Sequence, residues 1–312
     1  MDALRLAKRL NLLGPWLRNR FGGRVVKLPL DAGLSCPNRD GSISRGGCSF
    51  CPPSGSGTGR GSVPLAEQIE EGLARLSRQA ARRNQKLPQT LAYYQAFSST
   101  HLPALGLANL LAPALAAPVC GVIVSTRPDC LDGPRWQVLA QAAEQKPLWL
   151  ELGLQSSHDA TLAALGRGHD FECFARAVKH AKQLDIKVVA HVILGLPGES
   201  LEHMAATAQA LAELQVWGVK LHQLMVLEGS RLAGDYAAGR FQPWSREDWA
   251  RAASDFLGRL PRETLIHRLA ADPGRDRLIA PDWVADKQAS LESLALELER
   301  RDLRQGDLCR TS

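Results

Sequence analysis

The sequence predicts an α/β fold, a partial (β/α)6 TIM-like barrel with a small C-terminal α+β extension. Short apolar runs alternate along the chain with amphipathic helical patterns, and polar clusters follow the ends of these runs. Such alternation is typical of parallel βαβ units, whose right-handed crossovers allow a barrel, a partial barrel or an open doubly wound sheet. The partial barrel is favoured because the functional residues of barrels gather at the carboxyl ends of the strands.

Six strands are predicted from runs rich in β-branched, aromatic and aliphatic residues. They cover residues 24–30, 89–97, 119–126, 147–154, 186–194 and 217–226. Amphipathic stretches between them predict helices, for example over 65–83 and 171–185. In the second of these helices Phe171, Phe174 and Val178 share one face, which is expected to cover the sheet.

Polar signals follow five of the predicted strands. They are FSSTH (97–101), STRPDC (125–130), LQSS (154–157), LGLPGE (194–199) and LEGS (227–230). Because parallel strands of a barrel all end at the same rim, these five segments are predicted to meet there.

Three segments are predicted along the chain: a basic N-terminal segment (1–23), the barrel (24–235) and a C-terminal extension (236–312). The extension combines helical patterns with an apolar run at 264–269 and a closing helix at 282–304. No stretch rich in Pro, Gly or Ser separates it from the barrel, so it is predicted to pack on the barrel.

The chain has 38 basic and 32 acidic residues, which gives a formal charge of +6. Its first 27 residues hold seven basic side chains and one acidic one. This segment predicts either a nucleic-acid contact or an ordinary solvated basic helix face. No apolar run is suited to span a membrane and the N-terminus lacks a signal-peptide pattern, so a cytoplasmic protein with no membrane partner is predicted.

Three of the seven cysteines lie within sixteen residues of a glycine-rich segment, with the spacing Cys36-x11-Cys48-x2-Cys51. In a reducing compartment, clustered thiols indicate metal or redox chemistry rather than disulfides. Thiolates are soft ligands that suit zinc or an iron–sulfur cluster. A structural zinc site takes four protein ligands, whereas three thiolates on a [4Fe–4S] cube leave one iron open.

Two alternatives to a cluster stay open at this point. The first is an ordinary loop that happens to carry three cysteines. The second is a zinc site completed by a distant histidine, for which the candidates are His101, His158 and His169.

Several ordered stretches of the chain match a known family. They are KLPLDAGLSCPNRDGSISRGGCSFC (27–51), YYQAF (93–97), STRPDC (125–130), the long stretch 150–199 and LIHRLAADPGRDRLIAPDW (265–283). On these stretches the chain resembles the radical S-adenosylmethionine (radical SAM) enzymes, most closely the small bacterial proteins related to the catalytic subunit of Elongator. The commonest spacing in that superfamily is C-x3-C-x2-C, so the longer spacing here points to the Elongator-like branch.

The resemblance implies a [4Fe–4S] cluster ligated by Cys36, Cys48 and Cys51, with S-adenosyl-L-methionine chelating the open iron. It implies reductive cleavage of S-adenosyl-L-methionine to a 5′-deoxyadenosyl radical, with an electron donor such as flavodoxin or ferredoxin. The implied substrate is the C5 substituent of a tRNA wobble uridine, for instance carboxymethylaminomethyl converted to aminomethyl. Two alternatives remain: a radical SAM enzyme acting on a small metabolite, and a non-catalytic metal-containing binding protein.

Seven further residues are predicted to contact the cofactor: Ser98, Ser99, Arg127, Glu151, Gln155, His191 and Gly195. Many superfamily members hold the methionine amino group with Gly-Gly-Glu, where this chain has AFSST (96–100). Ser98 or Ser99 is expected either to replace that contact or to form a simple turn. Arg127 is expected to grip a carboxylate or to pair with Asp129.

Glu151 and Gln155 alternate onto one face of a predicted strand, among leucines that face the other way. Glu151 is expected to hold a ribose hydroxyl, or to pair with Arg127 or His191. His191 is either a core histidine or a cofactor contact. Gly195 lies in a turn where a bare backbone lets adenine approach, and no residue is assigned as catalytic.

Overall fold

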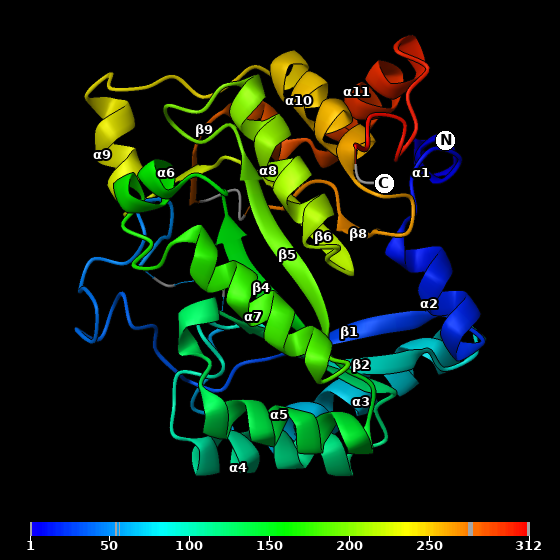
Figure 1. Ribbon diagram of the computed structural model, residues 1–312. Helices are drawn as coiled ribbons and strands as arrows, with labels where there is room; N and C mark the ends of the chain where they lie inside the picture. Colours follow the sequence, from blue (N-terminus) through cyan, green and yellow to red (C-terminus); the bar gives the residue numbers. More distant parts are fainter. Residues whose placement is uncertain (1, 54, 56, 274–276, 311–312) are drawn as a thin grey trace.

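A computed structural model describes residues 2–53, 55, 57–273 and 277–310 of the chain. Its main feature is a parallel sheet of seven strands in the order β1-β2-β3-β4-β5-β6-β8, curled into a partial barrel (Figure 1). The strands are β1 (Val25–Leu30), β2 (Gln89–Tyr94), β3 (Gly121–Thr126), β4 (Leu148–Gln155), β5 (Lys187–Leu194), β6 (Gly218–Gln223) and β8 (Leu265–Arg268). The predicted fold class is confirmed, with one strand more than predicted.

The seventh strand, β8, comes from the apolar run that was predicted as part of the extension. It pairs in parallel with β6, with Leu265 opposite Gly218. A separate two-stranded antiparallel sheet joins β7 (Val226–Leu227) to β9 (Leu278–Ala280).

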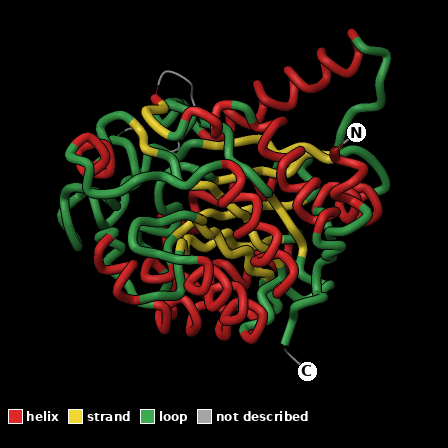
Figure 2. Tube along the Cα trace, turned by 90° about the horizontal axis from the view of Figure 1, so that it is seen from above, coloured by secondary structure: helices red, strands yellow, loops and turns green. Residues whose placement is uncertain are grey.

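Helices surround the sheet, as Figure 2 shows in a view from above. They are α1 (Asp2–Ala7), α2 (Leu13–Phe21), α3 (Leu65–Arg82), α4 (Ala104–Ala116), α5 (Gly133–Gln145), α6 (Asp159–Ala164), α7 (Phe171–Gln183), α8 (Leu201–Glu213), α9 (Arg231–Ala237), α10 (Arg246–Arg259) and α11 (Lys287–Arg300), with short 3₁₀ turns at Pro128–Cys130 and Asp282–Ala285. Among the described residues, no helix is both long and apolar enough to cross a membrane.

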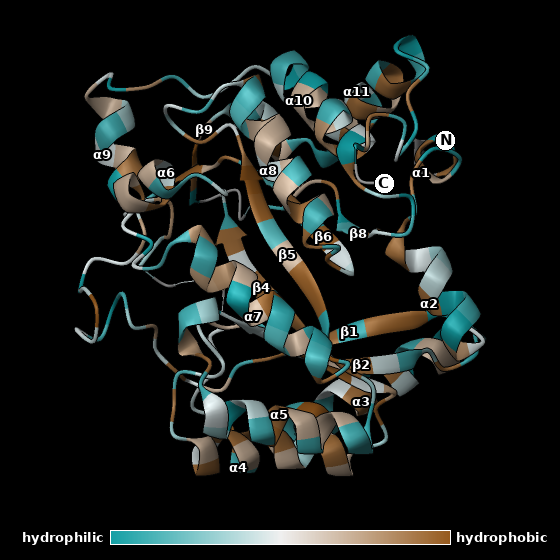
Figure 3. Cartoon of the chain, in the orientation of Figure 1, coloured by the Kyte–Doolittle hydropathy of each residue, from teal (hydrophilic) through white to brown (hydrophobic). Residues whose placement is uncertain are grey.

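Side chains of each strand alternate between the helices and the barrel interior. On β4, Leu148, Leu150, Leu152 and Leu154 face outward into the core beneath the helices. The apolar bands on β1 and β5 in Figure 3 belong to this arrangement. The inward set begins with an apolar layer, formed by Leu91, Ile123, Trp149, Val189 and Leu265.

Helix α2 closes one end of the barrel. Its Leu13 and Leu17 join the inward apolar layer. Because α2 precedes β1 directly, it lies where the strands begin, and the opposite end is left to the loops that follow the strands. The predicted basic N-terminal segment thus supplies the floor of the barrel.

Some basic side chains near the N-terminus form ion pairs with acidic residues elsewhere in the chain. Arg5 Nε donates to Glu299 Oε1 of α11 at 2.8 Å, and Arg9 lies 3.1 Å from Asp302. Lys27 reaches into the barrel. These three side chains therefore have intramolecular partners; the segment boundaries and a nucleic-acid role for this segment stay predictions.

The two ends of the chain are joined at the base of the barrel by Gln305. Its amide group donates to the carbonyls of Pro261 and Thr264, each at 2.7 Å, and accepts from the backbone N–H of Asn11 at 2.9 Å. The carbonyl of Asn11 in turn accepts from Ile266 of β8. The segment between α1 and α2, the strand β8 and the segment after α11 thus share one hydrogen-bond network.

Candidate functional site

A cavity of about 540 Å³ lies at the carboxyl ends of the strands. It brings together residues from six of the seven strands and from the loops that follow them. Eight of the ten site residues predicted from the sequence line it: Cys36, Cys48, Cys51, Ser98, Arg127, Glu151, Gln155 and His191.

The cysteine loop runs from the end of β1 to α3 and is anchored at its base by Asp31. This buried carboxylate accepts from the backbone N–H groups of Gly33 and Gly59, each at 3.1 Å. Gly33 has φ +64°, and a Cβ there would lie 2.6 Å from the carbonyl oxygen of Gly61. Only glycine fits so close an approach, which explains part of the glycine content of the loop.

The thiol sulfurs receive hydrogen bonds from basic and amide groups. Cys48 Sγ accepts from Asn38 Nδ2 at 3.3 Å and from Arg167 Nη1 at 3.4 Å, and Cys51 Sγ accepts from Arg39 Nη2 at 3.1 Å. Burial acts to raise the pKa of Cys48, but the charge and hydrogen bond of Arg167, the hydrogen bond of Asn38 and the charge of Arg127 together outweigh it, so the pKa is lowered overall. The surroundings of Cys48 therefore favour the thiolate, the form that binds metal.

Beside the thiols, three buried polar atoms have no hydrogen-bond partner among the described residues: Arg127 Nη1, Arg167 Nε and Asn38 Oδ1. Buried polar groups are normally satisfied, so unpaired ones beside a cavity indicate room for a polar ligand. The other nitrogens of Arg127 bind Asp129, at 2.9 and 2.7 Å. The predicted Arg127–Asp129 pair is present, but Arg127 is buried and lies on the cavity as well.

Each histidine considered as a fourth zinc ligand has one ring nitrogen beside another group, while His169 Nε2 is buried without a hydrogen-bond partner among the described residues. His101 Nε2 lies 2.6 Å from Asp40 Oδ2, His158 Nε2 lies 3.0 Å from the His203 carbonyl, and His169 Nδ1 lies 3.1 Å from the Asp170 carbonyl. In the part of the chain that is described, no three His, Cys, Asp or Glu side chains are grouped to hold a single metal ion.

The inner wall of the cavity is a polar cluster centred on Glu151. Its Oε1 lies 2.8 Å from Lys27 Nζ. Its Oε2 accepts from Tyr93 at 2.7 Å and lies 2.8 Å from both Lys220 Nζ and His191 Nε2. The expected pairing with His191 is present. We call these five residues the Glu151 cluster.

Burial and neighbouring charges together set the protonation states of the residues in the Glu151 cluster. Burial opposes ionisation of Glu151, yet Lys220 and Lys27 hold its pKa well below the ordinary value. Burial, with help from the other cations, lowers the pKa of Lys220 to about 8 and that of His191 to about 4. The cluster is therefore a carboxylate and two ammonium groups with a neutral imidazole near pH 7.

Sequence reasoning missed Lys27, Tyr93 and Lys220. The available signal was strand alternation, because VVKLPL and GVKLHQ each place a lysine between residues that face the helices. Arg39 and Arg167 carried no local signal as thiol partners; the contact of Arg167 with Cys48 spans 119 positions.

Two predicted cofactor residues do not line the cavity. Ser99 Oγ instead donates to the Tyr94 carbonyl at 3.4 Å, as a turn-forming hydroxyl does. Gly195 has φ +85° and faces Trp244. Gln155 does line the cavity, with φ +79° at an irregularity in the pairing of β4 with β5.

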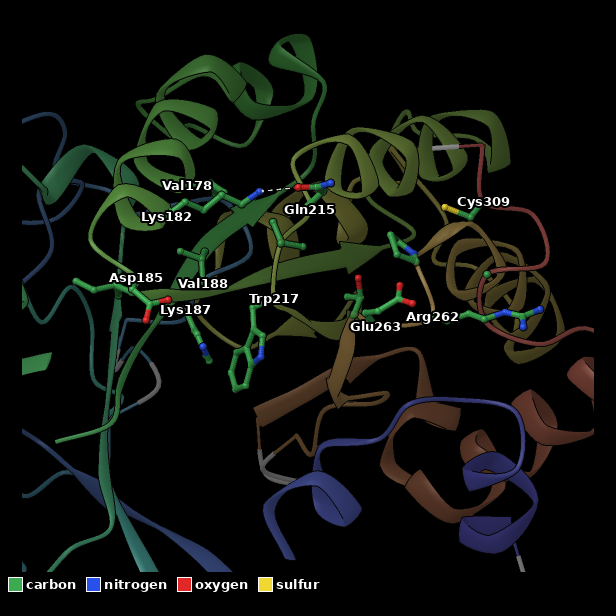
Figure 4. Close-up of a pocket in the computed structure, with 15 residues that line it drawn as sticks. Val178, Lys182, Asp185, Lys187, Val188, Gln215, Trp217, Arg262, Glu263 and Cys309 are labelled. Atoms are coloured by element: carbon green, nitrogen blue, oxygen red, sulfur yellow. Dashed lines mark hydrogen bonds between the residues drawn. The ribbon is translucent and has the colours of Figure 1, made fainter. Parts of the chain in front are cut away.

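A second cavity of about 700 Å³ lies at the end of the barrel where the strands begin (Figure 4). Its lining includes Lys187, Trp217, Glu263 and Cys309, and Lys187 Nζ lies 5.9 Å from the centre of a Trp217 ring. None of the site residues predicted from the sequence lies there.

Comparison with known proteins assigns the family. Residues 40–211 match the model of the radical SAM superfamily, and residues 216–300 match that of the Radical_SAM C-terminal domain. The chain belongs to the radical SAM superfamily of enzymes. Membership implies S-adenosylmethionine and a [4Fe–4S] cluster as cofactors.

Relatives of similar length are found in bacteria. The chain is 37% identical to the uncharacterized protein YtqA of Bacillus subtilis over 302 residues, 96% of this chain and 92% of YtqA. It is also 37% identical to protein YhcC of Escherichia coli over 293 residues, 93% of each chain.

Resemblance to Elongator is confirmed and covers a part of the chain. Human Elongator complex protein 3 is 27% identical over 156 residues, 49% of this chain and 28% of that protein. The structure of archaeal Methanocaldococcus infernus Elp3 superposes with a TM-score of 0.68 and 16% identity, over 90% of this chain and 64% of the Elp3 chain. The structural match shows a shared fold, and this chain spans less than two thirds of the Elp3 chain.

The residues present fit the cofactors that membership implies. Three unpaired thiols lie on one cavity, hydrogen-bond donors point at two of them, and two buried guanidinium groups beside them have unsatisfied nitrogens. A soft, anionic cluster and a ligand with a carboxylate suit this donor set.

Proposed function

We propose that Cys36, Cys48 and Cys51 hold a [4Fe–4S] cluster at which S-adenosyl-L-methionine is cleaved for radical modification of a substrate. The observation that carries this proposal is the placement of the three thiols on the same cavity as the Glu151 cluster. When bound, the reduced cluster and S-adenosyl-L-methionine supply a 5′-deoxyadenosyl radical.

In this proposal the basic groups around the thiols serve the cofactors. Arg167, Asn38 and Arg39 donate hydrogen bonds to the sulfurs and stabilise their anionic form. The unsatisfied nitrogens of Arg127 and Arg167 bind the methionine carboxylate. Ser98, which lines the cavity, takes the amino-group contact.

The remaining cavity residues orient the nucleoside half of the cofactor and keep water out. His191 and Gln155 supply polar contacts on β5 and β4; Glu151 orients the His191 ring through its hydrogen bond, while burial and the charge of Lys220 keep that ring neutral. Gly195, which lies outside the cavity lining, stays a prediction as a contact of adenine. An electron donor such as flavodoxin or ferredoxin supplies the electron for cleavage.

For the substrate we propose a tRNA wobble uridine, modified in its C5 substituent, for instance from carboxymethylaminomethyl to aminomethyl. Support comes from relatives: a Methanocaldococcus infernus protein named tRNA uridine(34) acetyltransferase is 28% identical over 153 residues, 48% of this chain and 28% of that protein. The proposed setting is the cytoplasm.

The cofactor proposal is tested by anaerobic reconstitution with iron and sulfide, followed by EPR of the reduced protein with and without S-adenosyl-L-methionine. We expect a [4Fe–4S]⁺ signal that changes on addition of S-adenosyl-L-methionine, and its loss in Cys51→Ala. The matched control is Cys120→Ala, because Cys120 is outside the cavity lining. A wild-type protein that retains zinc and shows no iron signal contradicts the proposal.

The substrate proposal is tested separately by comparing tRNA nucleosides from a strain with and without the gene. Accumulation of the carboxymethylaminomethyl form, reversed by the wild-type gene and not by the Cys51→Ala gene, is the expected result. An unchanged nucleoside profile from an active enzyme would instead favour a small-metabolite substrate.

A further inference from the structure

One wall of the cavity carries more positive charge than its acids balance. Neighbouring strands β5, β6 and β8 present His191, Lys220, His222 and Arg268 to the cavity. Pairing register places His191 beside Lys220 and Lys220 beside Arg268, so these side chains form a continuous row.

Glu151 cannot balance this row alone. One of its oxygens is taken by Lys27, and the other by Tyr93, His191 and Lys220. The other acid of the cavity lining, Asp272, is paired at 2.6 Å with Lys287 of α11. Lys27, Lys220 and Arg268 therefore face one carboxylate, which leaves a local excess of two positive charges.

Two groups of this row have unused hydrogen-bonding capacity. The guanidinium of Arg268 makes no hydrogen bond or ion pair with any residue in the described ranges. His222 Nε2 is buried and likewise has no partner there. Burial, then the charges of His191, Lys220 and Arg268, lower the pKa of His222 well below its usual value, so its imidazole stays neutral and can donate one N–H.

This row is distinct from the basic groups beside the cysteines. Arg167 and Arg127 are the cations that lower the pKa of Cys48. Lys220 and Arg268 instead act on His222 and His191. The cavity thus has two cationic subsites, one at the thiols and one at the β6–β8 wall.

We propose that Arg268, His222 and Lys220 bind a carboxylate of the substrate. The inference rests on the proposed function, in which Arg127 and Arg167 take the carboxylate of S-adenosyl-L-methionine. A guanidinium offers two parallel N–H groups that match the two oxygens of a carboxylate, and an enclosed site strengthens such a charged pair.

A carboxylate fits this wall better than a backbone phosphate of RNA. The row lies on the inner wall of the cavity, on the strands themselves, whereas a polynucleotide backbone follows the surface of a protein. If the wobble uridine enters the cavity with its C5 substituent pointing inward, the end of that substituent lies against Arg268. The wall then distinguishes a substituent ending in a carboxylate from one ending in an amine, because a like charge is repelled there.

The direct test uses acetate as the probe and acetamide as its neutral analogue. Each is titrated at constant ionic strength into full-length protein with labelled histidines, before and after reconstitution with iron and sulfide, and the His222 resonances are followed by NMR. We expect saturable shifts with acetate and none with acetamide. Arg268→Gln is expected to weaken acetate binding on the order of tenfold, the loss of one charged hydrogen-bonding partner.

Two further variants separate binding from a structural effect. Arg268→Lys keeps the charge but loses the two parallel N–H groups, so it is expected to bind acetate more tightly than Arg268→Gln and less tightly than the wild type. Arg240→Gln removes an exposed arginine that pairs with Asp235 away from the cavity, and acetate binding is expected to be unchanged. The proposal is overturned if acetate gives no saturable shift, if Arg268→Gln binds acetate as well as the wild type, or if inorganic phosphate binds more tightly than acetate.

The source of the carboxylate is settled by EPR of reconstituted Arg268→Gln protein. If the wall serves the substrate, S-adenosyl-L-methionine changes the cluster signal as in the wild type. Loss of that change assigns Arg268 to the cofactor and overturns the proposal. Because the acetate measurement needs neither cluster nor tRNA, its result stands apart from a failure of the proposed function.

Discussion

Two adjoining layers inside the barrel differ in chemistry. The layer beside α2 is apolar, with Leu13, Leu17 and Trp149 packed among inward strand residues. The next layer is the Glu151 cluster, where every member is charged or polar. Apolar burial stabilises a fold, whereas burying charges is costly even when they are paired. The first layer therefore supports the barrel, whereas the second supplies charged and polar groups to the cavity wall.

The largest loss of stability is expected when the charge pairing of the polar layer is broken. Glu151→Gln leaves two lysines without a counter-charge inside the barrel, and breaking a buried ion pair from one side costs about 3–5 kcal/mol. Urea unfolding measures this loss, with Glu144→Gln on the exposed face of α5 as the matched control. Adding Lys220→Met to Glu151→Gln is expected to recover part of the stability. A Glu151→Gln protein as stable as the wild type would show that the layer is not held by charge pairing.

A smaller effect is expected in the apolar layer. Leu17→Ala removes buried methyl groups of α2 at the closed end and is expected to cost about 2–5 kcal/mol in the free energy of unfolding. Leu4→Ala, at a side chain that is 69% exposed, is the control. The EPR response of the folded, reconstituted Leu17→Ala protein to S-adenosyl-L-methionine is expected to match the wild type. Loss of that response would mean that the two layers do not work separately.

The pH dependence of stability also separates the two layers, because the Glu151 cluster contains titratable groups. The folded pKa of His191 is about 4 against an ordinary value of 6.5, so the unfolded chain binds more protons between these values. The contribution of His191 to the free energy of unfolding is therefore fully present above pH 6.5 and is lost as the pH falls toward 4. Glu151, whose folded pKa is lowered, adds a further loss below its ordinary value of 4.5. We expect the free energy of unfolding, measured by urea at several pH values between 4 and 6.5, to depend less on pH in His191→Gln than in the wild type. An equal pH dependence in the two proteins contradicts this assignment to His191.

The smallest effect is expected outside both layers. Arg5→Gln removes an ion pair with Glu299 in which both side chains are about one third exposed. Solvent screens such pairs, so the melting temperature is expected to change less than for Glu151→Gln or Leu17→Ala. Differential scanning calorimetry checks this. A loss comparable to that of Leu17→Ala would show that the contact between α1 and α11 holds the barrel closed.

Most of the fold could be predicted, because strands under helices leave a regular apolar pattern. The last strand was the exception: the run 264–269 looks the same whether it pairs with β6 or packs in an extension, and tertiary pairing decided it. That the three clustered cysteines share one cavity was predictable since their spacing is local, and their role as ligands stays a prediction. Lys27 and Lys220 look like surface residues until alternation places them inward, and the contact of Arg167 with Cys48 depends on how two distant loops pack.

The hydrogen bonds of Gln305 bear on how the protein is made. A ribosome releases the chain from its N-terminus, and domains fold as their residues emerge. Asn11 is available early, but its partner at position 305 is synthesised after the cysteine loop and after every strand of the main sheet. These hydrogen bonds of Gln305 can therefore form only after every residue that lines the 540 Å³ cavity has been synthesised.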